Sequence, residues 1–308
     1  MQRLLNNIGL LSARGFCTGT APLPMTRIGP LLGIVVVSYH SDDRTVSFIT
    51  KELVKIRIPY KVVVVDNGAS PEEAGALAAR IPGVKVLRAE NGGYAKGNNL
   101  GAEWLKENVA PTHILFSNDD ISIHSESLVE VLLDRCALHP EIGAIGPEVV
   151  GLDGVRQSPE PYIGLWKRYF WMYLSSFFLS EEKKRRRFML DYPERAQEGC
   201  HYKLSGSFVL VDAPSFFRAG KFDEQTFLYA EENILSERFS AIGRQCWFCP
   251  SVRVVHEHGK TIKNHFQERS RALLQYDSMA YYYRTYKGYS RFETHLLRLF
   301  LRLILTVR

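Results

Sequence analysis

The sequence predicts an α/β fold with an open, mostly parallel sheet flanked by helices. Two short runs, residues 33–38 and 61–66, are rich in valine and isoleucine, which is typical of strands buried on both faces of a parallel sheet. Helical patterns follow each run, and strands and helices continue to alternate along the first half of the chain. Further strands are expected at 84–87, 113–116 and 142–145, and helices at 45–56, 71–81, 95–107 and 127–138.

The second half of the chain has a different pattern. Residues 163–187 are rich in aromatic side chains and end in a run of lysine and arginine. A strand is expected at 202–211, a helix at 231–241, an extended segment at 247–255, and a long helical tail from about 266 to the end. We therefore expect a disordered extension at 1–30, a main domain at 31–262 with a variable insertion at 163–200, and a helical C-terminal tail at 263–308.

Composition limits the class of protein. The chain has 308 residues, of which 45% are hydrophobic and 23% charged, as in ordinary globular proteins. A formal net charge of +6 favours an anionic partner, such as a nucleotide diphosphate or an acidic membrane surface, and no nucleic-acid recognition module is evident. Five scattered cysteines favour a reducing compartment over a disulfide framework. No apolar run is long enough for a membrane-spanning helix.

The first 30 residues are basic and contain no acidic residue. This composition resembles that of a transit peptide. We favour instead a disordered extension, or translation that begins at Met25. In either case the segment is not expected to belong to the fold.

Polar residues follow three of the expected strands. Ser38-Tyr39, Asp66-Asn67 and Asn118-Asp119-Asp120 all lie where an apolar strand ends. In open α/β sheets, ligands bind beyond the carboxyl ends of the strands, so these residues predict one shared site. Asp66 is suited to accept hydrogen bonds from a nucleobase or ribose, although a turn or helix N-cap aspartate is the simpler interpretation of this residue alone.

A segment rich in glycine and asparagine precedes the helix expected at 95–107. In residues 91–99, glycines allow close approach of the backbone to a ligand, and the helix N-terminus favours a diphosphate. The segment has neither P-loop nor dinucleotide-binding spacing, and a simple strand-to-helix turn is the alternative. The candidate donor-binding residues here are Asn91, Gly97 and Asn98.

Two acidic pairs suggest a division of chemical roles. Asp119 and Asp120 at a strand end repel each other unless they are solvated or bind a cation, and oxygen ligands suit Mg²⁺ or Mn²⁺, which would bridge a diphosphate. A solvated turn is the alternative. Glu231 and Glu232 begin a helix, where one of them could act as a general base, although charged first-turn residues are common.

Two histidines follow the extended segment at 247–255. His256 and His258 could contact the diphosphate or complete the metal site. A buried, hydrogen-bonded histidine is an equally good interpretation of either residue.

Taken in order, these segments resemble the family 2 glycosyltransferases, in particular the rhamnosyltransferase-like branch that builds bacterial surface polysaccharides. The resemblance covers approximately residues 34–261, and the ordered set of motifs is more specific than any one motif. The matching segments are Val37-Ser38-Tyr39, Val65-Asp66-Asn67-Gly68, residues 91–99, Asn118-Asp119-Asp120, Leu204-Ser205-Gly206-Ser207, Lys221-Phe222-Asp223-Glu224, residues 227–238 and Val255-His256.

The resemblance implies a single GT-A-type nucleotide-diphospho-sugar transferase domain, a divalent metal (Mn²⁺ or Mg²⁺) and inversion at the anomeric carbon. By this resemblance Asp66 is the nucleoside contact and Asp120 the metal ligand, with Asn118 in place of the first aspartate of the family's Asp-x-Asp motif. The second acid of the family's Glu-Asp pair falls on Glu232, with Glu231 as its close competitor for the role of base. A later family aspartate falls on Ile234, a second departure.

The acceptor side is expected to involve residues 163–187, where such enzymes diverge. Hydrophobic and cationic side chains there would suit a lipid-linked, pyrophosphate-bearing acceptor at a membrane surface, and an ordinary packing helix is the alternative. In the tail, Arg298 and Arg302 interrupt an apolar helix one turn apart, which favours an interfacial or packed helix over a spanning one. The acceptor-side candidates are Trp166, Ser205, Gly206 and Arg238.

The sequence therefore predicts a metal-dependent, inverting glycosyltransferase that moves a sugar from a nucleotide-diphospho-sugar to a glycan or lipid-linked acceptor in surface polysaccharide biosynthesis. It is expected in the cytoplasm. Its positive net charge would also allow peripheral contact with the inner face of the cell membrane. Two alternatives are kept: a sugar nucleotidyltransferase, and a non-catalytic glycan- or lipid-binding protein on the same scaffold. The residues at 38–42 lack the basic, glycine-rich loop that the first alternative needs.

Overall fold

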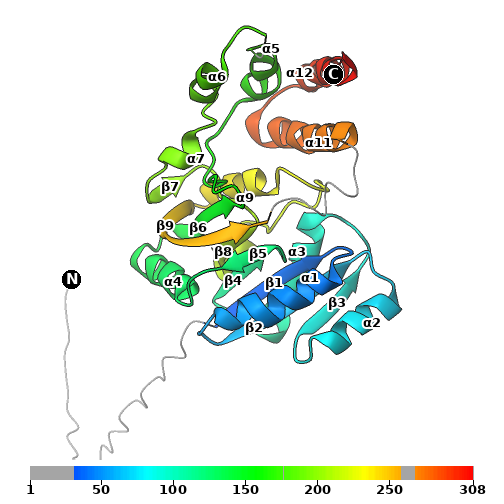
Figure 1. Cartoon of the computed structure of the whole chain (residues 1–308), viewed down its shortest axis with the longest axis vertical. Coiled ribbons are helices and arrows are strands. Elements are labelled where there is room, and N and C mark those ends of the chain that lie inside the picture. The colour runs from blue at the N-terminus through cyan, green and yellow to red at the C-terminus, as the bar shows by residue number, and fades with distance from the viewer. Residues whose placement is uncertain (1–30, 176, 258–267, 308) are drawn as a thin grey trace, which may run out of the picture.

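The computed structural model describes residues 31–175, 177–257 and 268–307, and in this part of the chain nine strands form one sheet. The extension expected at 1–30 and the candidate His258 lie outside the described residues. Figure 1 shows the sheet with helices on both faces and a separate group of helices at one end of the molecule. The strand order is β3-β2-β1-β4-β8-β6-β9-β5, and β7 pairs with β9.

The first half of the chain forms a parallel sheet, as predicted. Strands β1 (Leu32–Ser38), β2 (Tyr60–Asn67), β3 (Lys85–Ala89) and β4 (His113–Ser117) are parallel, and Ser38 lies beside Asp66 in the register. The carboxyl ends of these strands therefore meet at one edge of the sheet. The connecting helices are α1 (Asp42–Ser47), η1 (Phe48–Glu52), η2 (Leu53–Lys55), α2 (Pro71–Arg80) and α3 (Tyr94–Asn108).

The second half adds antiparallel pairings that the sequence did not indicate. β8 (Phe208–Asp212) runs antiparallel to β4 and places residues 205–207 beside the end of that strand. β5 (Ile121–Ile123) pairs antiparallel with β9 (Gln245–His256), and β6 (Ile142–Gly151) is parallel to β9. The remaining elements are α4 (Leu128–Leu138), β7 (Gly199–His201), α7 (Tyr192–Arg195), α8 (Ala213–Arg218) and α9 (Glu231–Ala241).

The two faces of the sheet bury separate hydrophobic cores. Because successive side chains of a strand point to opposite faces, Ile34 and Val36 join the core under α1, η1, α2 and α4, while Val35 joins the core under α3, α8 and α9. All three side chains are fully buried, and burial of each such aliphatic side chain contributes about 1.5–3 kcal/mol to stability. The rigid sheet thus fixes the edge at which the site is built.

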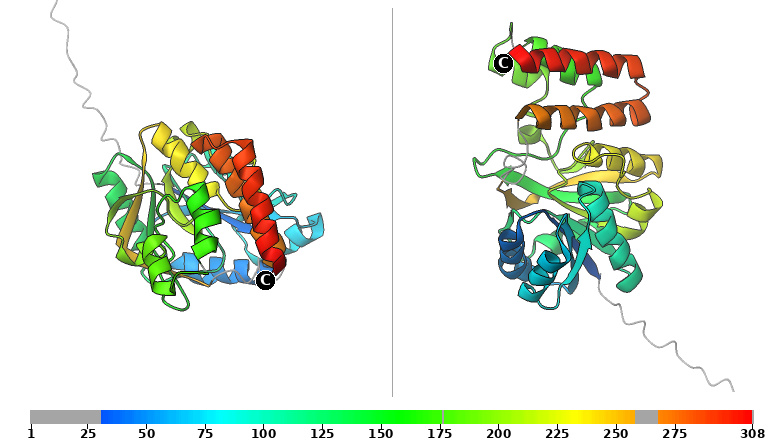
Figure 2. Two further views of the ribbon diagram at one scale, coloured as in Figure 1. Left: turned by 90° about the horizontal axis from the view of Figure 1, so that it is seen from above. Right: turned by 90° about the vertical axis from the view of Figure 1, so that its right-hand side faces the viewer.

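A third core joins the insertion to the C-terminal tail. η3 (Lys167–Trp171), α5 (Met172–Ser175), α6 (Glu181–Arg187), α11 (Glu268–Lys287) and α12 (Arg291–Val307) make up what we call the helical end. Side chains of η3, α11 and α12 pack on Ile234 of α9, and Figure 2 shows α12, α11 and α9 stacked above the sheet.

The tail is helical, as expected, and consists of two helices, α11 and α12. It folds back after Gly288, whose φ of 73° suits the left-handed turn that ends a helix, and α12 then packs against α11. This packing covers part of the apolar face of α12, where Leu297 and Leu301 are buried. Among the helices that the structure describes, none is both long and apolar enough to cross a membrane.

Candidate active site

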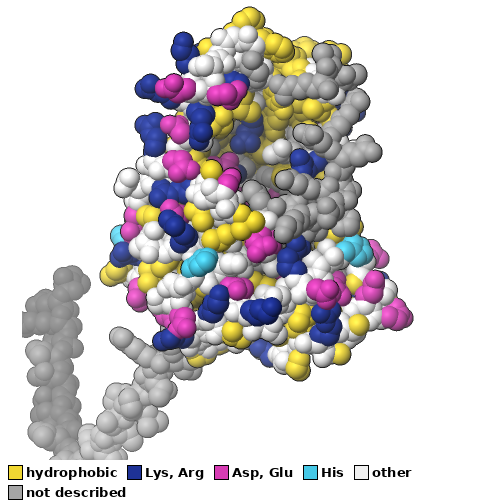
Figure 3. All heavy atoms as spheres, viewed as in Figure 1, with side chains coloured by type: hydrophobic (Ala, Val, Ile, Leu, Met, Phe, Trp, Pro, Cys, Tyr) yellow, Lys and Arg dark blue, Asp and Glu magenta, His cyan; other side chains and the backbone are white. Residues whose placement is uncertain are grey.

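A cavity of about 490 Å³ lies between the carboxyl edge of the sheet and the helical end. Figure 3 shows the molecule hollowed in this region. The cavity brings together segments that are far apart in the sequence. Of the candidate residues, Tyr39, Asn67, Asn91, Asn118, Asp119, Asp120, Ser205, Gly206, Glu231, Glu232 and His256 line it.

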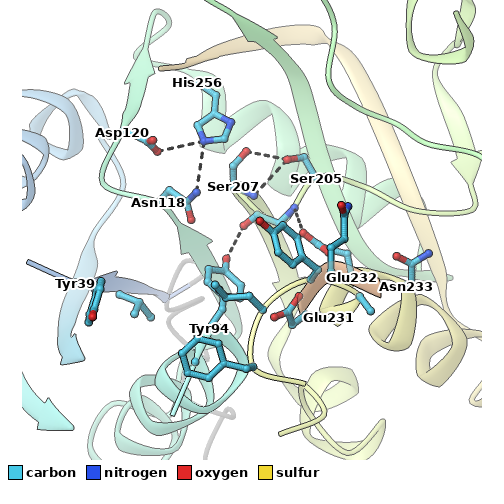
Figure 4. Close-up of a pocket in the computed structure, with 18 of the residues that line it drawn as sticks. Tyr39, Tyr94, Asn118, Asp120, Ser205, Ser207, Glu231, Glu232, Asn233 and His256 are labelled. Carbon is cyan, nitrogen blue, oxygen red and sulfur yellow. Dashed lines mark hydrogen bonds and ion pairs between the residues drawn. The ribbon is translucent and has the colours of Figure 1, made fainter. Parts of the chain in front are cut away.

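One side of the cavity carries Asp120 and His256 (Figure 4). Ile121 of β5 is paired with His256 of β9, which brings the preceding carboxylate to the imidazole, and Nε2 of His256 lies 3.2 Å from Oδ1 of Asp120. Nδ1 of His256 lies 2.9 Å from the amide oxygen of Gln157, which can only accept, so the Nδ1 position carries the proton. Nε2 is then the nitrogen that faces Asp120 and the cavity.

The electrostatics of this pair suit a divalent cation. Burial opposes ionisation of Asp120, but a His256 that is also protonated at Nε2 donates a hydrogen bond and adds a positive charge, and these outweigh burial and hold the pKa of the carboxyl below its ordinary value. A cation bound here would take the place of that Nε2 proton. An ionised carboxylate oxygen and an imidazole nitrogen are both accepted ligands of Mn²⁺. No group of three or more His, Cys, Asp or Glu side chains with metal-site geometry occurs among the described residues. Asp120 and His256 could thus supply two ligands to a cation, and its remaining ligands would have to come from outside this pair.

Asp119 has a different environment from its neighbour. Its Oδ2 accepts hydrogen bonds from Ser41 Oγ at 2.6 Å and Thr45 Oγ1 at 2.8 Å, and its Oδ1 accepts one from Arg44 Nε at 2.9 Å. Both carboxylate oxygens are thus used to hold α1 against the strand end. Asp119 was predicted to bind the nucleotide sugar; the structure places it in the cavity wall, with its carboxylate hydrogen-bonded to Ser41, Arg44 and Thr45.

The end of β2 carries two candidate residues with different placements. Asn67 lines the cavity, and its Nδ2 donates to Asn91 Oδ1 at 3.2 Å and to the carbonyl of Gly93 at 3.3 Å. Asp66 is 2% exposed and is not among the lining residues. Burial, followed by the charges of Asp42 and Glu73, raises the pKa of Asp66 to about 6.

Three further donor-side candidates lie behind the cavity wall. Ser38 is buried and accepts a hydrogen bond from Thr45 Oγ1 at 3.0 Å. Asn98 is also buried, and its Nδ2 donates to the carbonyl of Tyr94 at 3.0 Å. A Cβ on Gly97 would come within 3.1 Å of the Val37 methyl groups, so glycine lets α3 lie close to β1. These residues shape the site without forming its surface.

The other side of the cavity carries the glutamate pair (Figure 4). Tyr229 and Ala230 both have φ near 70°, in the left-handed region. The turn that they form is followed directly by Glu231 and Glu232, the first two residues of α9. Glu231 is 2% exposed, and its Oε1 has no hydrogen-bond partner among the described residues. Burial and then the charge of Glu232 raise the pKa of Glu231, so this carboxyl holds its proton to a higher pH than usual.

Glu232 is oriented by the segment before β8. The backbone N–H of Gly206 donates to Oε1 of Glu232 at 3.2 Å, and the Tyr94 hydroxyl donates to the Gly206 carbonyl at 2.7 Å. Burial and the charges of the two glutamates raise the pKa of Tyr94, which keeps its phenol a neutral donor. Tyr94 was not singled out from the sequence, although it stands inside the quoted motif at 91–99.

Two acceptor-side candidates lie elsewhere. The indole N–H of Trp166 donates to Oε1 of Glu293 at 3.0 Å, and Trp166 packs against the core of the helical end. Arg238 donates to the carbonyls of Gly220 at 2.6 Å and Lys221 at 2.9 Å, and it pairs with Asp223. Neither residue is part of the cavity lining, and the contacts of both join segments of the scaffold.

Several charged or amide side chains that were not predicted also line the cavity, among them Gln157, Glu160, Arg168 and Lys203. Glu160, Arg168 and Lys203 form one cluster, and Gln157 supports His256. Arg168 belongs to the basic, aromatic segment at 163–187, which was the one available signal. The others are isolated in the sequence and no local pattern marks them.

Comparison with known proteins identifies the family. The model of the family described as "Glycosyltransferase like family 2" matches residues 30–274. The N-acetylglucosaminyl-diphospho-decaprenol L-rhamnosyltransferase of Mycobacterium tuberculosis (strain H37Rv) is 27% identical over 247 residues, which cover 73% of this chain and 76% of that protein.

Solved structures with a similar fold are also glycosyltransferases. A mannosyltransferase from Pyrobaculum calidifontis in complex with GDP-Man and Mn²⁺ has a TM-score of 0.55 and 11% identity, covering 85% of this chain and 65%, less than two thirds, of that chain. S. aureus TarS 1–349 in complex with UDP has a TM-score of 0.50 and 12% identity, covering 84% of this chain and 72% of that chain. At this identity the likeness concerns the fold alone.

Proposed function

The chain belongs to glycosyltransferase family 2, and from that premise we propose that it is a metal-dependent, inverting glycosyltransferase that moves a sugar from a nucleoside diphosphate to a lipid-linked sugar acceptor. The observation that carries the proposal is the placement of Asp120–His256 and Glu231–Glu232 on opposite sides of one cavity (Figure 4). This is the arrangement that separates leaving-group stabilisation from deprotonation of the acceptor.

The donor would bind along the carboxyl edge of the sheet. Tyr39, Asn67 and Asn91 offer an aromatic ring and amide groups for the nucleoside, and the N-terminus of α3 favours the diphosphate. Asp66, buried behind Asn67, would act on the nucleoside only after a local shift. The same edge is the general ligand site of open α/β sheets.

Asp120 and His256 would hold a divalent metal next to the diphosphate. When bound, the metal neutralises negative charge that develops on the departing diphosphate. Asn118, whose amide lies 3.5 Å from Nε2 of His256, takes the place of a second carboxylate. One protein carboxylate with one imidazole leaves several coordination positions for the donor's phosphate oxygens.

Glu232 would act as the general base. An acceptor hydroxyl attacks the anomeric carbon, the new carbon–oxygen bond forms as the bond to the diphosphate oxygen breaks, and the hydroxyl proton passes to the Glu232 carboxylate. Attack from the side opposite the leaving group inverts the anomeric centre. The Gly206 N–H orients one oxygen of Glu232, and Glu231, protonated more readily, limits the repulsion within the pair.

The acceptor is proposed from the curated relative, whose name specifies a sugar attached through a diphosphate to a polyprenol. We propose an acceptor of this class for this chain, a rhamnosyl or related sugar as the group transferred, and a role in surface polysaccharide synthesis at the cytoplasmic face of the membrane. The apolar and cationic surface of the helical end supports this.

That surface combines exposed apolar side chains with a cationic helix. Phe177 and Phe178 are 73% and 79% exposed, and Phe292 and Leu303 of α12 are 75% and 68% exposed. α6 carries five cationic residues against two carboxylates, and Figure 3 shows dark blue side chains beside yellow ones at this end of the molecule. This combination fits the headgroup region of an anionic bilayer.

Calorimetric titration with a panel of nucleoside diphosphates, with and without Mn²⁺, tests the donor site. We expect one nucleotide to bind in a metal-dependent manner, and binding to be lost in Asp120→Ala. Transfer is then assayed with sugars on that carrier, and the anomeric configuration of the product is determined by NMR. Absence of nucleotide binding by the folded protein would instead favour a non-catalytic binding protein on this scaffold.

A further inference from the structure

Two cationic side chains line the cavity near the glutamate pair. Arg168 comes from η3, and Lys203 precedes the Ser205–Ser207 turn by two residues. Both share Glu160: Lys203 Nζ lies 2.9 Å from Oε1, and Arg168 Nη2 lies 3.7 Å from Oε2. The three side chains form a cluster in which two positive charges face one negative charge.

The cluster is held in place by the backbone. Residues 160 and 203 exchange two hydrogen bonds, from Glu160 N to Lys203 O at 2.9 Å and from Lys203 N to Glu160 O at 3.2 Å. Burial opposes ionisation of Glu160, but Lys203 and then Arg168 hold its pKa below the ordinary value, so it stays charged. The Tyr283 hydroxyl of α11 donates to the carbonyl of Ile163, which anchors the start of the segment that carries Arg168.

Arg168 retains hydrogen-bonding capacity that the described residues do not use. Its Nε is buried with no hydrogen-bond partner among them, and its ion pair with Glu160 is long. A guanidinium presents five donors in a planar fork that matches phosphate oxygens, and a buried unpaired donor is costly. The third cation of the cavity wall, Arg44, is paired with Asp119 and lies at the other, donor-side edge.

The cluster lies on the acceptor side of the cavity. Lys203 is close enough to Glu231 for its charge to counter the rise in that residue's pKa. Gln275 and Met279 of α11 complete the lining there and lead towards the helical end. The donor's diphosphate, in contrast, is assigned to the Asp120–His256 side, so a second anionic group needs a second cationic site.

We propose that Arg168 and Lys203, positioned by Glu160, form an anion subsite for the phosphate or diphosphate ester that joins the acceptor sugar to its lipid. This inference rests on the proposed function and specifies its acceptor. The sugar hydroxyl would reach Glu232 while the ester oxygens accept hydrogen bonds from Arg168 and Lys203. The lipid would then extend past Met279 to the apolar surface of the helical end.

The first test compares two acceptors that carry the same sugar, one as a short-chain alkyl diphosphate ester and one as a phosphate-free alkyl glycoside. For Arg168→Gln and Lys203→Gln we expect KM for the diphosphate ester to rise about tenfold or more, as for loss of a charge-assisted hydrogen bond. KM for the glycoside and affinity for the donor nucleotide should not change. Lys167→Gln, a neighbouring cation outside the cavity lining, is the matched control.

Equal losses with both acceptors, or no change with either, would overturn the subsite. A second test does not depend on transfer: citronellyl diphosphate is titrated into protein saturated with nucleoside diphosphate and Mn²⁺. We expect wild type and Lys167→Gln to bind it and both cavity variants to bind at least tenfold more weakly.

Binding that is absent from wild type or unchanged in the cavity variants also counts against the subsite. If the wild type binds citronellyl diphosphate and the cavity variants bind it more weakly, but no sugar transfer is detected, the anion subsite is supported and the proposed function is contradicted. Thermal unfolding verifies that each variant is folded, and Arg168→Lys, which keeps the charge, replaces Arg168→Gln if the latter does not fold.

Discussion

The backbone N–H of Gly206 points at Oε1 of Glu232 from 3.2 Å and joins the turn before β8 to the start of α9. A Cβ at position 206 would come within 2.6 Å of the same oxygen, so the absence of a side chain is what lets the carboxylate sit there. Because the Gly206 carbonyl also accepts a hydrogen bond from the Tyr94 hydroxyl, this one residue links Glu232, the proposed base, to α3. The orientation of Glu232 therefore depends on three segments of the chain.

Glu232→Gln should abolish most of the transfer activity. Removing a general base costs roughly 10²- to 10⁴-fold in kcat, while affinity for the donor nucleotide should stay near wild type because Glu232 lies away from Asp120 and His256. Glu231→Gln should retain activity within about tenfold, since glutamine resembles the protonated acid that the raised pKa of Glu231 favours. The opposite order of the two variants in steady-state kinetics would assign the base to Glu231.

Substituting the two proposed metal ligands should lower the affinity for Mn²⁺ without unfolding the protein. We expect Asp120→Asn and His256→Ala each to raise the Mn²⁺ concentration for half-maximal activity by about tenfold or more. EDTA should inactivate the wild type, and added Mn²⁺ should restore it. Asp134→Asn, an exposed carboxylate on α4, is the control. Wild-type turnover that survives complete chelation would rule out metal dependence.

Gly93→Ala should destabilise the fold through one close contact. Gly93 has φ of 89°, and its Cβ would lie 2.0 Å from the backbone oxygen of Phe227, the same oxygen that accepts the Tyr94 N–H at 3.0 Å. We expect a loss of about 2 kcal/mol or more in the free energy of unfolding, measured by urea denaturation.

Gly83→Ala is a matched control for that experiment. Gly83 has a similar φ of 85° but no atom within 4 Å of its Cβ position. Only the conformational cost of about 1 kcal/mol should appear there. Equal losses at the two glycines would mean that the contact with Phe227 adds nothing to the backbone strain.

Asp66 should make stability depend on pH. Its pKa of about 6 in the folded protein exceeds the unfolded value of 3.8, so between these values the folded chain binds more protons and stability falls as pH rises. Asp66→Asn should therefore stabilise the protein more at pH 7.5 than at pH 4, by on the order of 1–2 kcal/mol after solvent screening. Thermal unfolding at both pH values measures this, and an equal effect at both would contradict the raised pKa.

The helical end should bind anionic vesicles through its apolar side chains. Leu303→Glu and Phe292→Glu should weaken co-sedimentation with vesicles that contain phosphatidylglycerol. Each substitution would replace an apolar contact with a negative charge at the anionic headgroup boundary. Leu138→Glu is the control, since Leu138 of α4 is 66% exposed, close to the 68% of Leu303, but lies in another part of the molecule. If all three variants bind as the wild type does, this surface does not contact the membrane.

Several features followed from local sequence patterns. The valine-rich runs correctly indicated β1 and β2, because strands buried on both faces need apolar residues at every position. The polar residues after these strands correctly indicated an edge where Tyr39, Asn67 and Asp120 line one cavity, because carboxyl ends of parallel strands lie together. The glutamates begin α9 as expected.

Other features were decided by contacts between distant segments. Asp119 and Asp120 are adjacent, yet one is bound by α1 and the other by His256 at the end of β9, and nothing local distinguishes them. The fold of the tail brings Glu293 to the indole of Trp166, a contact that no local pattern indicated. Arg168 and Lys203 come from separate segments of the chain, and each pairs with Glu160.

The sequence by itself therefore determined the α/β class and the edge of the sheet that lines the cavity, since these depend on periodicity and on residues close to strand ends. The family was indicated by the resemblance of the ordered set of motifs. Only the tertiary structure decided which of the two aspartates is held by Ser41 and α1 and which lies beside His256, how Gly206 orients Glu232, and where the cations of the cavity lie. Those outcomes depend on the path of the chain through β8, β9 and α11, and on burial, which sets the cost of each unpaired charge.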